Sequence, residues 1–295
     1  LKVPNSNAAY LTIIGHTGAI SNFQMTGLRI DQNGMNNKGH NTGGAGPSNK
    51  YRFILHITSG TNVAVSDCTF DNVEGVNTLV FNGGATSGSY LVNNVSVSNC
   101  VFLNVGTDQD HDHSTIYTQA DGARIENNTF VGRLISSAPV FSYCAIETHG
   151  PHQIVVGNNI ENFVSAINFT AASWRNDASI CSDNAMYRVL SGIRVNVQDT
   201  YTNSANAMMR GASITGNVML IDPDFWASVL QRTAYGIYLV WSSAKSIEGI
   251  VIANNVIEYN VYSGSNSTIA TLASAGIIYT RSSGSTTPVD RTVVI

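Results

Sequence analysis

One short pattern recurs along the 295-residue chain and limits what it can fold into. In each copy, apolar and polar residues alternate over a few positions, break at an Asn or Cys, and then resume the alternation. The copies occupy residues 63–70, 95–102, 123–130, 154–161, 212–219 and 250–257, and a weaker copy occupies 23–30. The copies follow at intervals of roughly 30 residues, but the fourth interval is nearly twice as long and should contain a further unit. Self-similarity on this scale predicts a solenoid.

Alternation with a period of two predicts two short strands joined by a bend in each copy. A third alternating segment, usually centred on isoleucine, lies between copies, at residues 53–57, 78–81, 115–118, 145–148, 166–169, 192–195, 236–239 and 276–279. Three short strands per repeat predict one coil of a parallel β-helix, an all-β fold. Successive coils would then stack at the ordinary strand separation of about 4.8 Å.

Stacked coils bring equivalent residues into ladders along the axis of the solenoid. The bend of the repeat predicts an internal ladder of Asn128, Asn159, Asn217 and Asn255, because an amide can donate to its neighbour and also accept from it. Cys68 and Cys100 continue the same column, either as buried free thiols or as a disulfide. No pair of cysteines has the spacing of a zinc site.

Composition excludes several classes of function. Charged residues make up 12% of the chain, against about a quarter in an average domain, as a turn-rich β surface of Asn, Ser, Thr and Gly requires. A net charge of -4 and only four lysines argue against nucleic acid as a partner. No apolar run approaches the roughly 18 residues needed to span a bilayer, so membrane insertion is not expected.

The repeats run through the whole chain without a proline-rich or charged linker. We therefore expect one β-helix domain over residues 1–295. The chain opens at Leu1 without a signal-like segment and closes on a strand-like segment, so both ends look cut rather than capped, which predicts an excised or partial region of a longer chain.

The third strand of each coil carries the candidate site. If its isoleucines point inward, the flanking residues point outward. This predicts an outer face of His113, Thr115, Tyr117, Gln119, Tyr143, Ala145, Glu147, His149, Asn168, Thr170, Arg194, Asn196, Tyr238 and Val240. Such a long polar groove suits a chain-like ligand such as a polysaccharide. We take Tyr117, His149, Asn168, Arg194, His113 and Tyr238 from this face as candidate substrate-binding residues.

Glu147 and His149 form the sharpest motif, because two residues apart on one strand they share a face. Glu147 could act as general acid or nucleophile on a glycosidic bond, and we favour it as the catalytic acid. That chemistry needs a second carboxylate. Neighbouring strands supply none, so a loop must. Asp121 and Asp112 are the leading candidates, followed by Asp177 and Asp183. The alternative is an ordinary surface Glu and His in a polar sheet.

Residues 108–113, Asp-Gln-Asp-His-Asp-His, are the densest cluster of potential ligands. A solvated loop, a groove-side loop that binds sugar, and a metal site are all open here. The glycine and distal glutamate of a helix-loop-helix calcium loop are missing. We therefore predict no metal and no cofactor.

Two segments are expected to leave the coils as insertions. Residues 171–189 should form a wall of the groove and supply Trp174 for substrate binding. Residues 222–233 have the only helix-like pattern and should cover the far end of the groove. Trp226 and Trp241 are either sugar platforms or packing residues.

The repeated pattern with its Asn ladder, together with the segment 20–34, resembles the pectate-lyase-like right-handed β-helix superfamily. Within it, the low lysine content, the few charges and the Ile-Glu-Thr-His-Gly coil at 146–150 are most similar to bacteriophage tailspike depolymerases. The resemblance implies a right-handed, single-stranded parallel β-helix and hydrolysis of a bacterial surface polysaccharide, capsule or O-antigen. It also implies a homotrimer and a location on the virion or otherwise outside the cell.

The chain departs from two other branches of that superfamily. The Asn-Thr-Asp, Asp-Asp, Gly-His-Gly and Arg-Ile-Lys motifs of polygalacturonases are absent, with partial echoes at 148–150 and 192–194. The groove aspartates of pectate lyases are absent too. Two alternatives to hydrolysis stay open. One is a non-catalytic glycan-binding adhesin, and the other is a lyase that uses Arg194, or His149 with Tyr117, for β-elimination.

Overall fold

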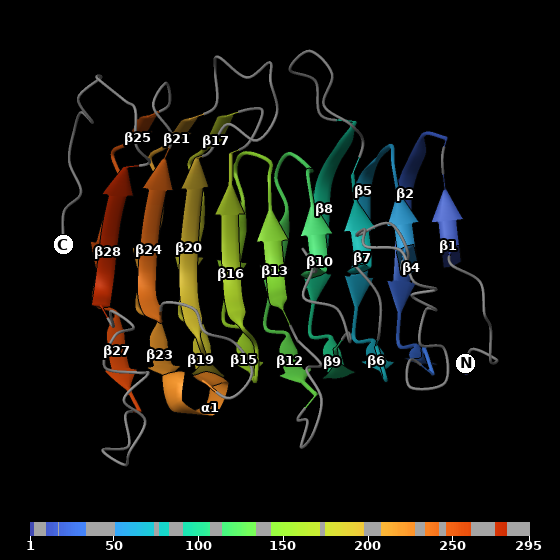
Figure 1. Ribbon diagram of the computed structural model, residues 1–295. Coiled ribbons are helices and arrows are strands. Elements are labelled where there is room, and N and C mark those ends of the chain that lie inside the picture. The colour runs from blue at the N-terminus through green and yellow to red at the C-terminus, as the bar shows by residue number, and fades with distance from the viewer. Residues whose placement is uncertain are drawn as a thin grey trace.

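A computed structural model describes residues 1–2, 10–16, 18–33, 51–73, 77–82, 91–106, 114–133, 143–171, 175–197, 208–227, 234–241, 246–260 and 275–281. These residues form a stack of three-strand coils in which all paired strands are parallel. In Figure 1 the strands of one sheet stand side by side along the whole molecule, with the two termini at opposite ends. The predicted right-handed single-stranded parallel β-helix is confirmed.

Three long sheets run along the helix axis, and each coil contributes one strand to each. Sheet 1 contains β1 (Tyr10–His16), β4 (Tyr51–Ile57), β7 (Asn77–Phe81), β10 (Ser114–Thr118), β13 (Cys144–Thr148), β16 (Ser165–Thr170), β20 (Ser191–Val197), β24 (Tyr235–Trp241) and β28 (Ala275–Arg281). Sheet 2 contains β2 (Ile20–Thr26), β5 (Gly60–Ser66), β8 (Val92–Ser98), β11 (Arg124–Glu126), β14 (Ile154–Val156), β18 (Ile180–Ser182), β22 (Ser213–Thr215) and β26 (Val251–Ala253).

Sheet 3 contains β3 (Arg29–Asp31), β6 (Thr69–Asp71), β9 (Val101–Val105), β12 (Thr129–Gly132), β15 (Asn159–Glu161), β19 (Ala185–Val189), β23 (Val218–Ile221) and β27 (Val256–Tyr259). A short fourth sheet contains β17 (Arg175–Asp177), β21 (Met208–Arg210) and β25 (Ser246–Glu248). The one helix in the described residues is α1 (Pro223–Ala227), below β19 and β23 in Figure 1. No helix in this part of the chain is long and apolar enough to cross a membrane.

The bend between sheets 2 and 3 depends on one column of residues with left-handed backbone. Gly27, Asp67, Asn99, Asn127, Gly157, Asp183, Gly216 and Asn254 have φ between 54° and 69°. Glycine, asparagine and aspartate tolerate this conformation best, which explains why these residue types precede the ladder in each repeat. The bend is therefore encoded locally, coil by coil.

From Asp67 onward, the residue after each left-handed position forms the internal ladder. Asn158 Nδ2 donates to the Ile125 carbonyl at 2.9 Å and to Asn184 Oδ1 at 2.9 Å, and Asn184 Oδ1 also accepts from the Asn158 backbone N–H. Asn128, Asn158, Asn184, Asn217 and Asn255 repeat this arrangement, and Cys68 and Cys100 continue the column. Each buried amide is thereby hydrogen-bonded, as burial requires.

One ladder residue was predicted wrongly. Asn158, 0% exposed, occupies the column, whereas the predicted Asn159 is exposed and begins β15. Val155 pairs with Ile125, so this copy of the repeat is shifted by one residue from its predicted alignment. The two asparagines are adjacent and locally equivalent, and only the hydrogen bonds to Asn128 and Asn184 distinguish them.

The core between the sheets is filled by stacked apolar side chains. Phe102 stacks on Phe70 with ring centroids 4.9 Å apart and on Phe130 at 4.7 Å, and Phe163 meets Phe130 edge to face. The four cysteines are all buried free thiols: Cys68, Cys100, Cys144 and Cys181. For Cys68 and Cys100 this agrees with the predicted alternative of free thiols and not with a disulfide. Burial raises the pKa of Cys100 to about 12 and also raises the pKa of Cys181.

The predicted insertion at residues 171–189 is wrong. Residues 175–189 build β17, β18 and β19, and Cys181 pairs with Val155 and Ile214. This is the further coil that the long fourth interval predicted. This coil was not recognised in the sequence, because Cys181 replaces the Ile or Val of other copies and Met186 replaces their Phe.

The predicted helix within residues 222–233 is present as α1. Asp222 caps it by accepting from the Phe225 N–H at 3.0 Å, and Pro223 occupies the first helical position. Trp226 is 3% exposed and donates its indole N–H to the Arg188 carbonyl, and Trp241 is also 3% exposed. Both tryptophans are therefore packing residues and not sugar platforms.

In the strands of sheet 1 two successive residues face the core, which requires a local bend in the strand and changes which residues face outward. Thr115 and Ala145 are 0% exposed, although simple alternation predicted both on the outer face. A Cβ on the equivalent Gly192 would lie 2.6 Å from Met219 Sδ in the core, so this position points inward together with the next residue, Ile193. As a result, residues three apart share the outer face, and Ser165 Oγ reaches Asn168 Oδ1 at 3.1 Å within β16.

Candidate functional site

Five polar or aromatic residues lie in one row across the outer face of sheet 1. Tyr117, Glu147, Asn168, Arg194 and Tyr238 pair in register on β10, β13, β16, β20 and β24. Neighbouring members are one strand separation, about 4.8 Å, apart along the axis. The sequence predicted all five as outward-facing, and the structure brings them into one continuous row.

Glu147 is the centre of a hydrogen-bonded cluster. Its side chain is only 10% exposed in spite of its outward orientation. His149 Nε2 lies 2.8 Å from Glu147 Oε1, and the Ser114 hydroxyl donates to Glu147 Oε2. Glu147 is thus not an ordinary surface glutamate, because both of its oxygens are engaged and little of it reaches solvent.

These contacts keep Glu147 ionised. Burial alone would raise the pKa of a carboxyl group, but the hydrogen bond and charge of His149, the hydrogen bond from Ser114 and the charge of Arg194 together outweigh it. The pKa of Glu147 consequently lies below the ordinary value of 4.5. At neutral pH this residue is a carboxylate, which suits a nucleophile or base better than a general acid.

Tyr117 and His149 form an aromatic pair beside Glu147. Their ring centroids are 4.9 Å apart at 47°, and Gln119 Nε2 donates to the Tyr117 hydroxyl at 2.7 Å. The chain turns directly after His149 at Gly150, where a Cβ would lie 1.9 Å from the Ala120 carbonyl oxygen. Only glycine fits there, and this close approach fixes where His149 stands relative to the preceding coil.

Beyond Glu147, the row continues with an amide and a cation. Asn168 is 8% exposed, and Ser165 donates to its Oδ1. Arg194 places its guanidinium carbon 5.9 Å from the centre of the Tyr238 ring. Tyr235 lies beside Tyr238 with ring centroids 4.8 Å apart.

The structure does not join Glu147 to a second carboxylate among the described residues. Asp121 lies past the end of β10, and its Oδ1 is 2.7 Å from His152 Nδ1. Asp177 is on β17 of the short sheet, paired with Arg210 at 3.3 Å. Asp183 is exposed in the bend between sheets 2 and 3. Asp112, His113 and Trp174 lie outside the described residues, as do the other members of the 108–113 cluster.

Ser114 is the residue that sequence reasoning missed. Alternation placed its side chain inside the coil, but the bend in β10 turns it outward beside Tyr117 and toward Glu147. The signal was the column Thr115, Ala145, Ala166, Gly192, Gly236 and Gly276, whose small side chains indicate a position that faces the core. Two adjacent inward positions require a bend.

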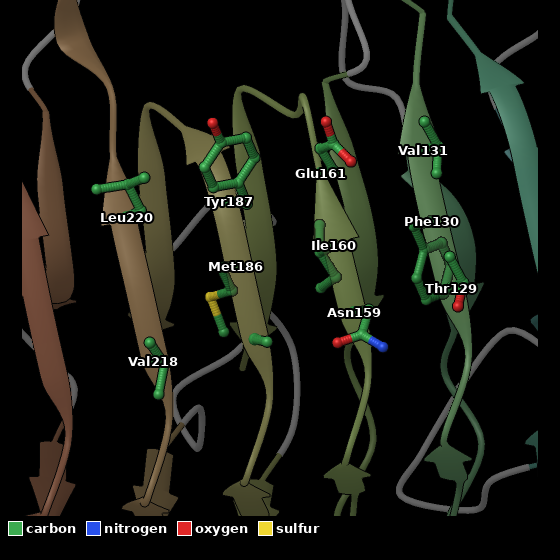
Figure 2. A pocket seen from close by; sticks show the side chains of 11 residues that line it. Thr129, Phe130, Val131, Asn159, Ile160, Glu161, Met186, Tyr187, Val218 and Leu220 are labelled. Carbon is green, nitrogen blue, oxygen red and sulfur yellow. The ribbon is translucent and has the colours of Figure 1, made fainter. Parts of the chain in front are cut away.

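A separate hollow of about 370 Å³ lies on sheet 3. Figure 2 shows its walls on β12, β15, β19 and β23, with Tyr187 and Glu161 side by side at one end and Asn159 at the other. Tyr187 is 45% exposed and Val218 is 52% exposed. Glu161 is the only acidic residue that lines it, so this surface lacks the clustered titratable groups of the Glu147 row.

No group of three or more metal-binding side chains is present in the portion of the chain that the structure describes. The residues of the 108–113 cluster are not part of that portion, so its metal alternative is untested.

Comparisons with known proteins support the fold. No family model and no curated protein sequence matches this chain. The chain is similar in structure to a mutant tailspike protein of E. coli bacteriophage HK620, with a TM-score of 0.62 and 15% identity over 82% of this chain and 39% of the tailspike. It is also similar to that phage's tailspike in complex with a pentasaccharide, with a TM-score of 0.53 and 15% identity over 95% and 58% of the two chains.

A further mutant of the same tailspike, also in complex with a pentasaccharide, gives a TM-score of 0.56 at 14% identity and covers 89% of this chain and 48% of that one. The chain therefore spans between 39% and 58% of the length of these tailspikes. Its fold is the right-handed parallel β-helix of the phage tailspikes, as the resemblance of its sequence implied.

Proposed function

We propose that this chain binds a bacterial surface polysaccharide, capsule or O-antigen, along sheet 1 and hydrolyses it at Glu147. One observation carries the proposal: a nearly buried carboxylate, held ionised by Ser114 and His149, sits in the middle of a row of sugar-compatible side chains. The long axis of that row matches a chain-like ligand. Tailspikes of similar fold that are in complex with oligosaccharides support the same ligand class.

Glu147 would act on the anomeric carbon as an ionised group. In a retaining course it attacks that carbon and forms a glycosyl ester, and in an inverting course it removes a proton from the attacking water. Either course needs a second carboxyl group to protonate the departing sugar oxygen. The sequence favoured Glu147 as the catalytic acid, whereas the lowered pKa favours the nucleophile or base.

We propose Asp112 or Asp121 as that second carboxyl group. Asp112 precedes Ser114 by two residues, and two residues of chain span at most about 7 Å. Because Ser114 contacts Glu147 directly, Asp112 is the stronger of the two. Asp121 would first have to leave His152, which lies 2.7 Å away.

A lyase is the second candidate, favoured by the contact between Tyr117 and His149. In β-elimination a base removes the proton α to a uronate carboxyl group, the leaving oxygen is protonated, and an unsaturated sugar forms. His149 and Tyr117 have suitable chemistry for the two proton transfers. A non-catalytic adhesin is the third candidate, because no second carboxylate reaches Glu147 among the described residues.

The proposed location is the virion, as part of a phage tail, and the proposed assembly is a homotrimer. Sheet 3 supports the assembly, because Tyr187, Val218 and Val256 expose 45%, 52% and 57% of their surface on adjacent strands. The hollow in Figure 2 lies on the same sheet. An exposed apolar surface of this kind is typical of a contact between chains.

The test is digestion of purified capsular and O-antigen polysaccharides by the wild type and by Glu147→Gln, following reducing ends and near-ultraviolet absorbance together. Reducing ends without absorbance, lost in the variant, are the expected result. A rise in both signals would identify a lyase and overturn hydrolysis. Retained binding with no cleavage by the wild type would identify an adhesin.

A further inference from the structure

Arg194 is a cation that makes no direct ion pair within the row. No hydrogen bond or ion pair joins its guanidinium to another described residue, and its Nε is buried without a partner. Its neighbour on the same face, Asn196, likewise has a buried Oδ1 without a partner. Unsatisfied buried polar atoms cost free energy, so each one in a native protein calls for an explanation, such as a catalytic role or a bound water or ion.

Three other arginines in the described residues make ion pairs or hydrogen bonds within the chain. Arg210 is 3.3 Å from Asp177, Arg124 pairs with Glu126, and Arg188 contacts Asn162 and Tyr187. Arg194 lies over the Tyr238 ring, 5.9 Å from its centre, as Arg188 lies over Tyr187, but no carboxylate of the described residues is paired with Arg194. The stacking orients a planar donor group whose geometry matches a carboxylate.

The position of Arg194 in the row determines where a carboxylate of the ligand would bind. Arg194 is two strands from Glu147, a separation of about 9.6 Å along the axis. Asn168 lies between them and is 8% exposed. A glycan that follows the row would therefore have one sugar at Glu147 and another at Arg194.

We propose that Arg194 binds the carboxylate of an acidic sugar, so that the polysaccharide held in this groove is a uronate-type or other carboxylate-bearing polymer. This rests on the proposed function for the identity of the ligand as a glycan. Arg194 would donate its N–H groups to the carboxylate, and Asn196 and Tyr238 would line the same subsite. The attraction between Arg194 and the sugar carboxylate offsets the repulsion between an anionic polymer and ionised Glu147.

The first experiment needs neither cleavage nor the natural polymer. Protein labelled with nitrogen-15 is titrated with sodium glucuronate, with glucose, and with sodium chloride at matched ionic strength, and the arginine Nε–H resonances are followed. The Arg194 signal is assigned by its loss in Arg194→Gln. Arg210, already paired with Asp177, is the internal control.

A saturable shift at Arg194 with glucuronate, absent with glucose and chloride and absent at Arg210, is the expected result. Equal shifts at Arg194 and Arg210, equal shifts with chloride, or no saturable shift at Arg194 up to high millimolar glucuronate would each overturn the proposal. The outcome does not depend on whether Glu147 hydrolyses anything, so the two proposals fail separately.

The second experiment uses immobilised bacterial polysaccharides and the Glu147→Gln protein. For any polymer that is bound, reduction of its carboxyl groups to alcohols should weaken binding about tenfold or more, the usual effect of losing a charge-assisted hydrogen bond. Arg194→Gln should remove most of this difference, whereas Arg210→Gln should preserve it. Tight binding of a neutral polymer that is insensitive to Arg194→Gln would overturn the proposal.

Discussion

Ser114 and Glu147, 33 positions apart in sequence, are joined by a hydrogen bond between adjacent coils. The bond exists because Ser114 faces outward on β10, as Tyr117 does, and meets the carboxylate of the next coil there. Together with His149 on the other oxygen, it holds the one nearly buried glutamate of the groove in a single orientation. Glu147 lies between the other two, so His149 contacts the carboxylate and not the Ser114 hydroxyl. The arrangement therefore differs from a serine-histidine-acid triad, in which histidine is central.

Ser114→Ala should lower kcat about tenfold with a smaller effect on KM, because hydrogen bonds to charged groups contribute about 1.5–3 kcal/mol. Since Ser114 lowers the pKa of Glu147, the acid limb of the pH–rate profile should also move to higher pH. Initial rates of polysaccharide cleavage from pH 4 to pH 8 measure both effects. Ser98→Ala on sheet 2 is the control, and an unmoved acid limb would argue against a role for Ser114 in positioning.

The ionised state of Glu147 should be visible in the pH dependence of stability. Its pKa in the folded chain is below 4.5, so its contribution is complete above about pH 4.5 and is lost as pH falls through the lower folded value. Wild type should therefore lose free energy of unfolding relative to Glu147→Gln as pH falls from 7 to 3. Urea unfolding followed by circular dichroism gives this difference, and an opposite trend would mean that burial outweighs the contacts.

The adjacent residues Asn158 and Asn159 offer a matched pair for the ladder. Asn158→Ala should reduce the free energy of unfolding by about 2–4 kcal/mol, since it leaves several buried partners unsatisfied. Asn159→Ala, at an exposed position, should change it by less than about 0.5 kcal/mol. Chemical denaturation of both variants checks this, and equal losses would contradict the register described here.

All four thiols should be inert in the folded chain. They are buried, and burial raises the pKa of Cys100 and Cys181 so that little thiolate is present at pH 8. An aromatic disulfide reagent should label none of them within minutes in native buffer and all four in concentrated urea. Rapid labelling of any cysteine in buffer would show that its coil opens readily.

The proposed homotrimer can be tested at the apolar surface of sheet 3. Val218→Asp should shift sedimentation toward the monomer, because an aspartate buried at a contact would be an unpaired charge. Val251→Asp, the same change at a 41% exposed valine on sheet 2, is the control. Equal behaviour of both variants and the wild type would remove sheet 3 from the contact.

Much of the fold could be predicted because every coil of a solenoid carries a similar sequence pattern. Two alternating segments and a third one per repeat predicted the three sheets, and the Asn or Cys at the bend predicted the ladder. Glu147, Asn168 and Arg194 could be placed in one row for the same reason, since equal positions of successive coils must coincide.

Where the sequence pattern allowed two alignments, only the tertiary structure shows which one the chain adopts. Asn158 and Asn159 are alike in sequence, and only the hydrogen bonds from the coils on either side select Asn158. Simple alternation predicted that Ser114 points inward. In the structure, Thr115 and Ile116 both pack against the core, and the Ser114 side chain points outward and contacts Glu147. By itself the sequence determined the coil and its polar row, because these follow from residue periodicity. The exact register of each strand and the contacts of the Glu147 carboxylate depend on neighbouring coils. The hydrogen bonds and packing between coils that decide them form only once the coils are stacked.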